Sequence, residues 1–197
     1  MKRISIFILI FFMIFNAFAG IDEGLVFHYK FDGDAKDETG NTNDGTVYGA
    51  QLTTDRLDRQ KAAYLFDGED DYIDFGDVDV DFTNTFSISS WIYMENTSTQ
   101  TILCKHKGDS DQDGWHFKIH EGQLSFRWGD NSWQYENSIN LISDKWYHVV
   151  FAYNDDTDQF AFYVNGEMVT SGIRDINVSE NNYPLLAGKQ YQGTLND

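Results

Sequence analysis

Apolar and polar residues alternate through most of the chain, and this period of two predicts short β-strands. In the strand expected over residues 86–94, Trp91 and Tyr93 fall on the face opposite to Ile88. Residues 146–153 are apolar on both faces, which is typical of a central strand in a sandwich. No apolar stripe at helical spacing exceeds two turns after the first 19 residues, so helices are not expected there.

The strongest local signal is a hairpin at Asn165 and Gly166. These residues follow an alternating segment over residues 159–164 and precede a returning segment over residues 167–170. Asn-Gly tolerates the positive φ of a two-residue hairpin turn. Further strands are predicted over residues 25–31, 46–52, 62–66, 72–75, 101–105, 115–120, 123–128 and 185–187. Many short strands with Asp-, Asn- and Gly-containing turns predict an all-β fold, a two-sheet antiparallel β-sandwich of the jelly-roll type.

The N-terminus has the composition of a signal peptide. Two basic residues precede an almost wholly apolar segment over residues 4–15, and residues 17–19 (Ala-Phe-Ala) match the small-x-small pattern before a cleavage site. We therefore predict that residues 1–19 are removed and that residues 20–197 form one domain. The apolar segment is shorter than the roughly 20 residues that span a bilayer, so membrane insertion is not expected. An uncleaved anchor is the alternative.

The chain is strongly acidic. It carries 32 acidic against 14 basic residues, a formal net charge of −18, and the predicted leader removes only positive charge. Such a surface repels nucleic acids, whose binding needs basic patches, and it suits divalent cations, which prefer carboxylate oxygens. The single cysteine, Cys104, excludes a disulfide within the chain and is interpreted as a small buried residue of a strand.

Five segments, in this order along the chain, resemble a known family. They are GLVFHYKFDG (24–33), AYLFDGEDDYI (63–73), FSISSWI (86–92), WYHVVF (146–151) and FYVNGE (162–167). Together they resemble the LamG-like jelly-roll family, within the concanavalin A-like lectin/glucanase superfamily and related to pentraxins. The resemblance implies two packed antiparallel sheets, frequent calcium binding, and a binding or adhesion role in secreted proteins. We therefore expect a secreted, extracellular or periplasmic, lectin-like module that binds a glycan or cell-surface polysaccharide, with structural calcium as its cofactor.

A first candidate calcium site is the loop over residues 32–44, which is dense in carboxylates, amides and backbone carbonyls. In the family that it resembles, an acidic residue in this loop shares a calcium ion with an acidic residue near the end of the chain. The matching positions are Asp32 and Asp37, with Asp197 from the far end. The alternative is that the Asp and Asn residues serve only as turn formers.

A second candidate calcium site is the acidic segment over residues 109–114. Asp109, Asp111 and Asp113 hold positions one, three and five, with glycine at six, as at the start of an EF-hand loop. Position twelve is His120 instead of glutamate, and the flanks are predicted strands, so the segment is not an EF-hand. It is expected either to chelate calcium weakly or to be a solvated hairpin tip.

The candidate glycan site is the segment over residues 126–135. Arg127, Trp128, Asp130 and Trp133 combine aromatic surfaces with hydrogen-bonding groups. Sugar rings present apolar C–H faces that can stack on aromatic rings, while their hydroxyls bond to carboxylates and guanidinium groups. The alternative is that the tryptophans fill the core, and both interpretations stay open for each of them.

Two other functions stay open. A glycosidase or polysaccharide lyase on the same fold would need paired catalytic carboxylates. Asp77, Asp79 and Asp81 alternate, but no glutamate pair accompanies them, and solvated charges are the favoured interpretation. A protein-binding adhesion module is the other alternative.

The resemblance also concerns the end of the chain. In the family, the segment that matches residues 193–197 begins the last strand, which then continues for several residues. We therefore expect this chain to lack most of that strand and to leave residues 25–31 without a partner. Further domains of a longer chain, or a strand from another protein, would then complete the sheet.

Overall fold

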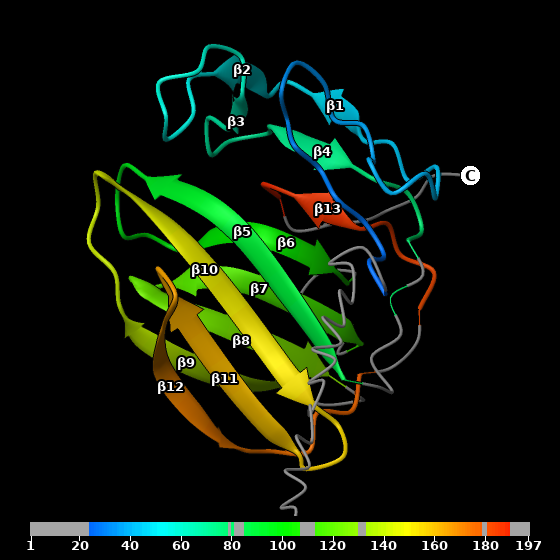
Figure 1. Ribbon diagram of the computed structural model, residues 1–197, viewed down its shortest axis with the longest axis vertical. Coiled ribbons are helices and arrows are strands. Elements are labelled where there is room, and N and C mark those ends of the chain that lie inside the picture. The colour runs from blue at the N-terminus through cyan, green and yellow to red at the C-terminus, as the bar shows by residue number, and fades with distance from the viewer. Residues whose placement is uncertain are drawn as a thin grey trace, which may run out of the picture.

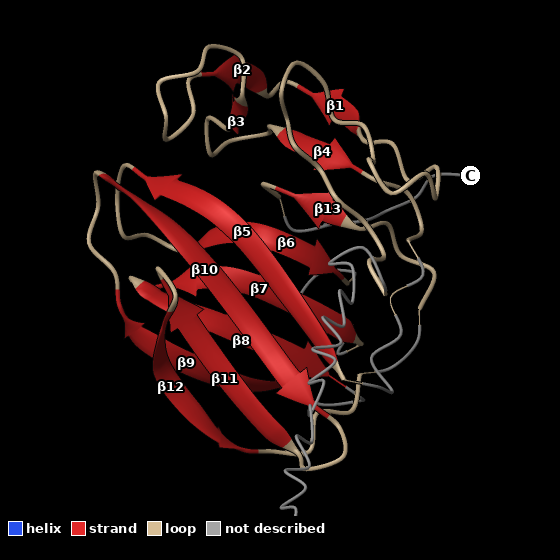
Figure 2. Ribbon diagram, in the orientation of Figure 1, coloured by secondary structure: helices blue, strands red, loops and turns tan. Residues whose placement is uncertain are grey.

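The computed structural model describes residues 24–78, 80, 85–106, 113–129, 133–178 and 181–189. All regular secondary structure in this part of the chain is β-strand, arranged in two main sheets and a small hairpin (Figures 1 and 2). The predicted leader, residues 1–19, and Asp197 lie outside the described residues. Within the described ranges, no helix has the length and apolar character that crossing a bilayer requires.

The larger sheet has seven strands, and every neighbouring pair is antiparallel. In spatial order they are β1 (Thr46–Tyr48), β4 (Tyr72–Asp74), β13 (Leu186–Ala187), β6 (Gln100–Lys105), β7 (Gly114–His120), β8 (Gln123–Gly129) and β9 (Trp133–Asn140). The short strand β13 joins β4 to β6, so a segment late in the chain completes the middle of this sheet.

The smaller sheet has four antiparallel strands. In spatial order they are β12 (Glu167–Ile173), β11 (Gln159–Val164), β10 (Lys145–Asn154) and β5 (Phe86–Met94). A separate hairpin of β2 (Gln51–Thr53) and β3 (Ala63–Leu65) lies beyond the end of this sheet at which β5 ends and β10 begins (Figure 1). The two layers confirm the predicted sandwich.

The core lies between the inner faces of the two sheets. Phe126 of β8 stacks on Phe151 of β10, with ring centroids 4.1 Å apart and planes inclined by 9°. Phe162 of β11 packs against the same Phe151 ring at 4.9 Å. Along β10 every second side chain is buried, from Tyr147 to Tyr153, as the period of two requires for a strand with one face on the core.

The predicted hairpin is present. Asn165 and Gly166 have φ angles of 53° and 84° and join β11 to β12, so that Val164 pairs with Glu167. The two positive φ angles are those of a type I′ turn, which Asn-Gly adopts with little strain. Asn165 also accepts a hydrogen bond through Oδ1 from the backbone N–H of His148 at 2.9 Å, which ties the turn to β10.

Residues 25–31 do not form the regular strand that their alternation predicts. Among the described residues, their one bridge joins Tyr29 to Asp37. The backbone N–H of His28 donates to the Asp37 carboxylate at 3.1 Å instead of to a neighbouring strand. Phe31 has a φ of 56°, a left-handed conformation that interrupts an extended run. The expectation of a missing last strand concerns residues 193–197, which lie outside the described residues, and it stays a prediction.

Trp128 is a core residue, so of the two interpretations left open for it the structure supports core filling over contact with a ligand. Its side chain is 2% exposed, and its ring stacks on Phe126 with the centroids 6.1 Å apart. Trp128 shares the inner face of β8 with Leu124 and Phe126, which are also buried. The alternation along β8 therefore directs the side chain of Arg127 to the opposite face, away from the core.

Trp128→Ala is expected to lower the free energy of unfolding by about 3–5 kcal/mol, because removing a buried tryptophan leaves a cavity. Tyr135→Ala is the matched control, since Tyr135 of β9 is 63% exposed, and it should change stability by less than about 0.5 kcal/mol. Urea-induced unfolding followed by circular dichroism measures both. Equal stability of Trp128→Ala and the wild type would contradict the core assignment.

Candidate functional site

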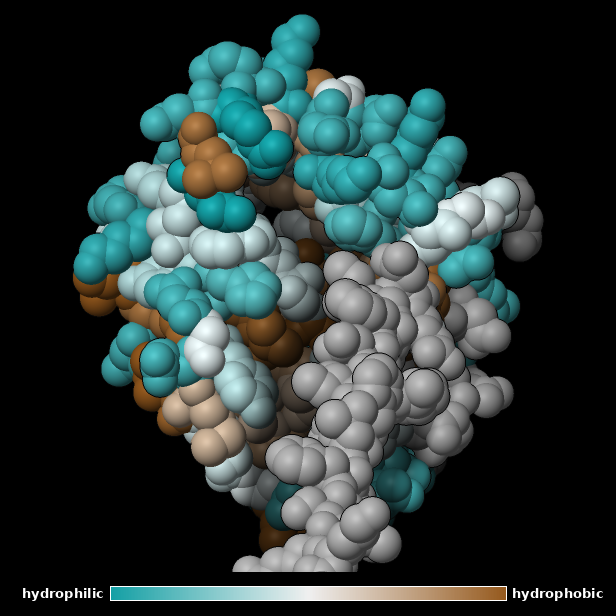
Figure 3. Space-filling model, in the orientation of Figure 1, coloured by the Kyte–Doolittle hydropathy of each residue, from teal (hydrophilic) through white to brown (hydrophobic). Residues whose placement is uncertain are grey.

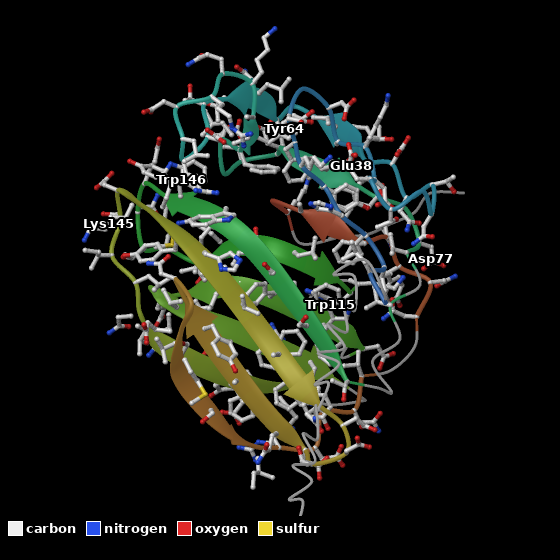
Figure 4. The ribbon with its side chains drawn as sticks, viewed as in Figure 1. Glu38, Tyr64, Asp77, Trp115, Lys145 and Trp146 are labelled. Carbon is white, nitrogen blue, oxygen red and sulfur yellow. The ribbon has the colours of Figure 1, made fainter. Side chains whose placement is uncertain are left out.

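An aromatic cluster lies on the outer face of the four-stranded sheet. Trp91 and Tyr93 point outward from β5, because Ile88 on the alternate positions faces the core. On β10, Trp146 lies opposite Tyr93, and His148 lies opposite Trp91. We refer to Trp91, Tyr93, Trp146 and His148 as the aromatic face. Figure 4 shows Trp146 at the end of the sheet nearest the β2–β3 hairpin.

The side chains of the aromatic face contact one another across the two strands. The Trp91 and His148 rings lie 5.1 Å apart, and the Tyr93 and Trp146 rings lie 5.7 Å apart with planes inclined by 54°. Ser89, the next outward residue of β5, forms a 2.8 Å hydrogen bond between its Oγ and His148 Nε2. Trp91 and Tyr93 are nevertheless each 46% exposed, so large aromatic surfaces stay open to a ligand.

A cation from a distant segment covers part of this face. Arg56, in the loop between β2 and β3, places its guanidinium carbon 4.0 Å from the centroid of the Trp91 ring. The loop is held by the buried carboxylate of Asp55, which accepts hydrogen bonds from the backbone N–H groups of Leu57 and Arg59. The Arg59 guanidinium completes this arrangement with a 2.7 Å ion pair to Asp55. Arg56 is thus presented to Trp91 by a loop with its own internal bonds.

A groove borders the outer face of the sheet and reaches core-facing residues such as Ile88, Phe160 and Trp115. Its lining includes the outward side chains of Ser87 and Ser89 from β5, Tyr163 from β11 and Met168 from β12, and residues 24–28 border it. Figure 3 looks onto this side of the molecule and shows apolar surface near its centre. The groove meets the aromatic face at Ser89, which bonds to His148. The aromatic face itself combines rings, a hydroxyl, an imidazole and the Arg56 guanidinium, which suits a ligand with both apolar faces and hydroxyl groups.

Of the four residues of the predicted glycan site, the structure describes the side chains of Arg127 and Trp128, which lie on opposite faces of β8. Arg127 lies on the outer face of the seven-stranded sheet, opposite His116 of β7 and Tyr135 of β9. Trp128 follows it on the core side of the same strand. Asp130 and the side chain of Trp133 lie outside the described residues.

The outer face of the seven-stranded sheet is polar around Arg127. Lys118 of β7, Ser125 of β8 and Asn137 of β9 lie side by side in register. Lys118 and Ser125 are buried, and within the described part of the chain Ser125 Oγ and Asn137 Oδ1 have no hydrogen-bond partner. Buried polar atoms of this kind are usually satisfied by ordered water or by a ligand. This surface is separate from the aromatic face, because the two belong to opposite sides of the sandwich.

Two buried histidines lie beside this polar surface. His116 is 2% exposed, with its Nε2 at 2.9 Å from Thr101 Oγ1 and its Nδ1 at 3.4 Å from His106 Nε2. Burial, and then the neighbouring charges of His106, Lys118 and Arg127, hold the pKa of His116 well below its usual range. The ring is therefore neutral in the folded protein.

The first predicted calcium loop contains an acidic side chain with spare coordinating capacity. Asp37 accepts hydrogen bonds through Oδ1 from the N–H of His28, and from the N–H and hydroxyl of Thr39. Its buried Oδ2 has no partner in the described chain. Asp44 lies close by, since its Oδ1 accepts from the Asp37 N–H at 3.0 Å. Carboxylate oxygens of this kind fit a calcium ion.

The pKa values of Tyr29 and Asp37 are both shifted, and the shift of Tyr29 reflects burial and the negative charge of this loop. Burial, together with the charges of Asp37 and Asp44, raises the pKa of Tyr29. Burial opposes ionisation of Asp37, but the hydrogen bonds from Thr39 and His28 lower the pKa of Asp37 overall. Asp37 is thus ionised at neutral pH. Glu38, the residue that follows Asp37, and Trp146 are on opposite sides in the upper part of Figure 4.

The other predicted metal ligands are less informative. Asp32 is exposed in a bend. Asp113 is half-buried just before β7, whereas Asp109 and Asp111 lie outside the described residues. Among described residues, the carboxylates that approach one another within 4.8 Å as a group of three belong instead to Asp67, Asp70 and Asp71.

Asp67 has a structural use in its turn, because its Oδ1 accepts the N–H groups of Glu69 and Asp70. These bonds lower the pKa of Asp67.

Of the carboxylates considered for catalysis, Asp77 forms an ion pair with the buried Lys105, whose ammonium group also donates to the carbonyl oxygen of Tyr183. Asp79 and Asp81 lie outside the described residues. Asp77 therefore ties the loop after β4 to β6 and to the segment before β13.

A family model described as the concanavalin A-like lectin/glucanases superfamily, of the laminin G type, matches residues 67–196. No curated protein matches the chain in sequence. Domain 4 of an extracellular arabinanase from Geobacillus stearothermophilus, in complex with arabinotriose, has a similar structure. The TM-score is 0.63 at 22% identity, over 85% of this chain and 84% of that one.

Two botulinum neurotoxin structures also share the fold. The serotype D binding domain gives a TM-score of 0.61 at 16% identity, over 89% of this chain and 45% of that one. The binding domain of botulinum neurotoxin DC, in complex with SialylT, gives 0.59 at 19% identity, over 86% and 44%. The chain spans less than half the length of these two binding domains.

The neutral state of His116 predicts a pH dependence of stability. The unfolded chain binds a proton at this side chain below about pH 6.5, whereas the folded protein does not, so the free energy of unfolding falls as the pH drops below that value. His116→Gln should weaken this dependence, and His28→Gln, at an exposed position, should retain it. Urea unfolding at about pH 7.5 and about pH 5.5 measures the difference. Equal losses in His116→Gln and the wild type would contradict the assignment.

Proposed function

Because the chain belongs to the concanavalin A-like lectin/glucanases superfamily, we propose that it is a glycan-binding module and that the sugar binds on the aromatic face. The observation that carries this proposal is the exposure of Trp91 and Tyr93 on β5, beside Trp146 and His148 of β10. Strands β5 and β10 pair with each other without a break in register from Phe86–Tyr153 to Met94–Lys145. The rings that they carry are therefore held on a rigid surface. A ligand would meet preformed aromatic surfaces with little ordering cost.

The chemistry of the face suits a sugar. The apolar C–H faces of a pyranose or furanose ring can stack on Tyr93 or Trp146, and its hydroxyls can bond to Ser89 and His148. The arabinanase domain in complex with arabinotriose and the neurotoxin domain in complex with SialylT share the fold, which supports a sugar as the ligand class. The fold alone does not select a ligand, so the proposal depends on the side chains of this face.

Secretion and calcium belong to the same proposal. The signal-like composition of residues 1–19 supports export to the extracellular space or periplasm. The unpartnered Oδ2 of Asp37 and the adjacent Asp44 support a calcium ion in the loop over residues 32–44. Because the loop pairs with the irregular segment over residues 25–31, the ion would stabilise the edge of the domain without touching the sugar.

The variant Trp91→Ala/Tyr93→Ala is expected to weaken glycan binding at least about tenfold, because truncating exposed aromatic residues at the centre of a binding site typically costs about 2 kcal/mol or more. Tyr135→Ala, an exposed tyrosine of the other sheet, should bind as the wild type does. A glycan array identifies the ligand, and isothermal titration calorimetry gives the dissociation constants.

Unchanged binding by the Trp91→Ala/Tyr93→Ala variant, together with weaker binding by Tyr135→Ala or Arg127→Ala, would move the site to the polar surface of the seven-stranded sheet. Absence of binding to any glycan of the array would reject the proposed function. Circular dichroism spectra of the variants, matched to that of the wild type, would separate either result from loss of the fold.

Calcium is expected to raise the melting temperature by several degrees, since a ligand of the folded state at a hundredfold excess over its dissociation constant adds about 2.7 kcal/mol. Asp37→Asn should abolish the response, because asparagine keeps an oxygen for His28 and Thr39 but removes the charge. Asp67→Asn should respond as the wild type does. Thermal melts with calcium and with a chelator test this. A response lost in Asp67→Asn and retained in Asp37→Asn would place the ion at the other carboxylate group.

A further inference from the structure

Arg56 is a cation that has no acidic partner among the described residues. The chain carries 32 acidic residues, yet no described carboxylate lies within ion-pair distance of the Arg56 guanidinium. The neighbouring acidic residue, Asp55, is already engaged with Arg59 and with two backbone N–H groups. No described residue accepts a hydrogen bond from the Arg56 side chain, although a guanidinium offers five donors.

The position of Arg56 is specific. Its guanidinium carbon lies 4.0 Å from the Trp91 ring centroid, a cation–π contact that favours one placement of this long side chain. On the strand side, His148 packs beside Trp91 at 5.1 Å, and Ser89 bonds to His148. Arg56 therefore adds a positive charge with free donors directly above the aromatic face, while the stacking surfaces of Tyr93 and Trp146 lie at the next pair of residues.

We propose that the aromatic face selects glycans whose sugar rings carry an anionic group, a carboxylate or a sulfate ester, and that Arg56 binds this group. The inference rests on the proposed function and names its ligand class. The guanidinium donors would bind the anionic oxygens as a fork, while the adjacent aromatic residues hold the ring. The net charge of −18 repels anionic glycans at long range, so a local cation at the contact is required for such a ligand.

The test compares matched ligands that differ only in charge. One pair is an oligogalacturonate and its methyl ester, and the other is a sulfated galactose oligosaccharide and its desulfated form. The wild type is expected to bind the anionic member of at least one pair about tenfold more tightly or better. The pair that shows the preference identifies carboxylate or sulfate as the recognised group.

Three variants separate the role of Arg56 from a general effect of charge. Arg56→Gln should abolish the preference for the anionic member, so that the variant binds the two members of a pair with dissociation constants within about twofold of each other. Lys61→Gln removes the same charge from an exposed position of the same loop and should keep the preference. Arg56→Lys keeps the charge without the planar fork and should retain only part of it.

Equal binding of anionic and neutral members by the wild type, or an unchanged preference in Arg56→Gln, would overturn the inference and leave glycan binding on the aromatic face standing. An equal loss in Arg56→Gln and Lys61→Gln would also overturn it, because the effect would then be general. Failure of every oligosaccharide to bind would reject the inference together with the proposed function.

Discussion

The stacking of Phe126 on Phe151 lies at the centre of the contact between the two sheets, and most of the other features follow from that contact. Both sheets have to bury one face, and a strand side chain lies either on that face or on the opposite one. Once Phe151 and Ile88 face the core, register sets Trp146 and His148 outward on β10 and Trp91 and Tyr93 outward on β5. The aromatic face therefore results from core packing together with large aromatic residues at the solvent-facing positions of β5 and β10.

Asp55, Asp67 and Asp37 all accept backbone N–H groups in loops, but they differ in whether both carboxylate oxygens are used. Asp55 and Asp67 accept backbone N–H groups within their own turns, and these bonds hold the loops in shape. Asp37 does the same with one oxygen but leaves the other buried and unpartnered. Abundance of Asp is thus weak evidence for a metal, whereas an unsatisfied buried oxygen points to one position.

Local patterns in the sequence predicted the strands and turns well where local chemistry decides the structure. The Asn165-Gly166 hairpin and the strand over residues 86–94 are examples, because turn φ angles and a period of two suffice there. Residues 25–31 show the limit, since a side-chain bond to Asp37 and the positive φ of Phe31 override their alternation. The face occupied by Trp128 also depended on which side of β8 meets the other sheet.

Only part of the aromatic face could be predicted from the sequence. The placement of Trp91 and Tyr93 opposite Ile88 was a usable signal, but their partnership with Trp146 and His148 needs the β5–β10 register. The approach of Arg56 from the β2–β3 loop is a long-range contact that no local pattern encodes. Arg127 and Trp128 are adjacent in sequence and were predicted to share a site, but they lie on opposite faces of β8.

The most direct measurement is a ¹H–¹⁵N NMR titration of the mature domain with the best-binding oligosaccharide. The indole N–H signals of Trp91 and Trp146 should shift, whereas those of the buried Trp115 and Trp128 should stay in place and serve as controls in the same spectrum. Unshifted signals for Trp91 and Trp146, with changes confined to the backbone of β8 and β9, would contradict a glycan site on the four-stranded sheet.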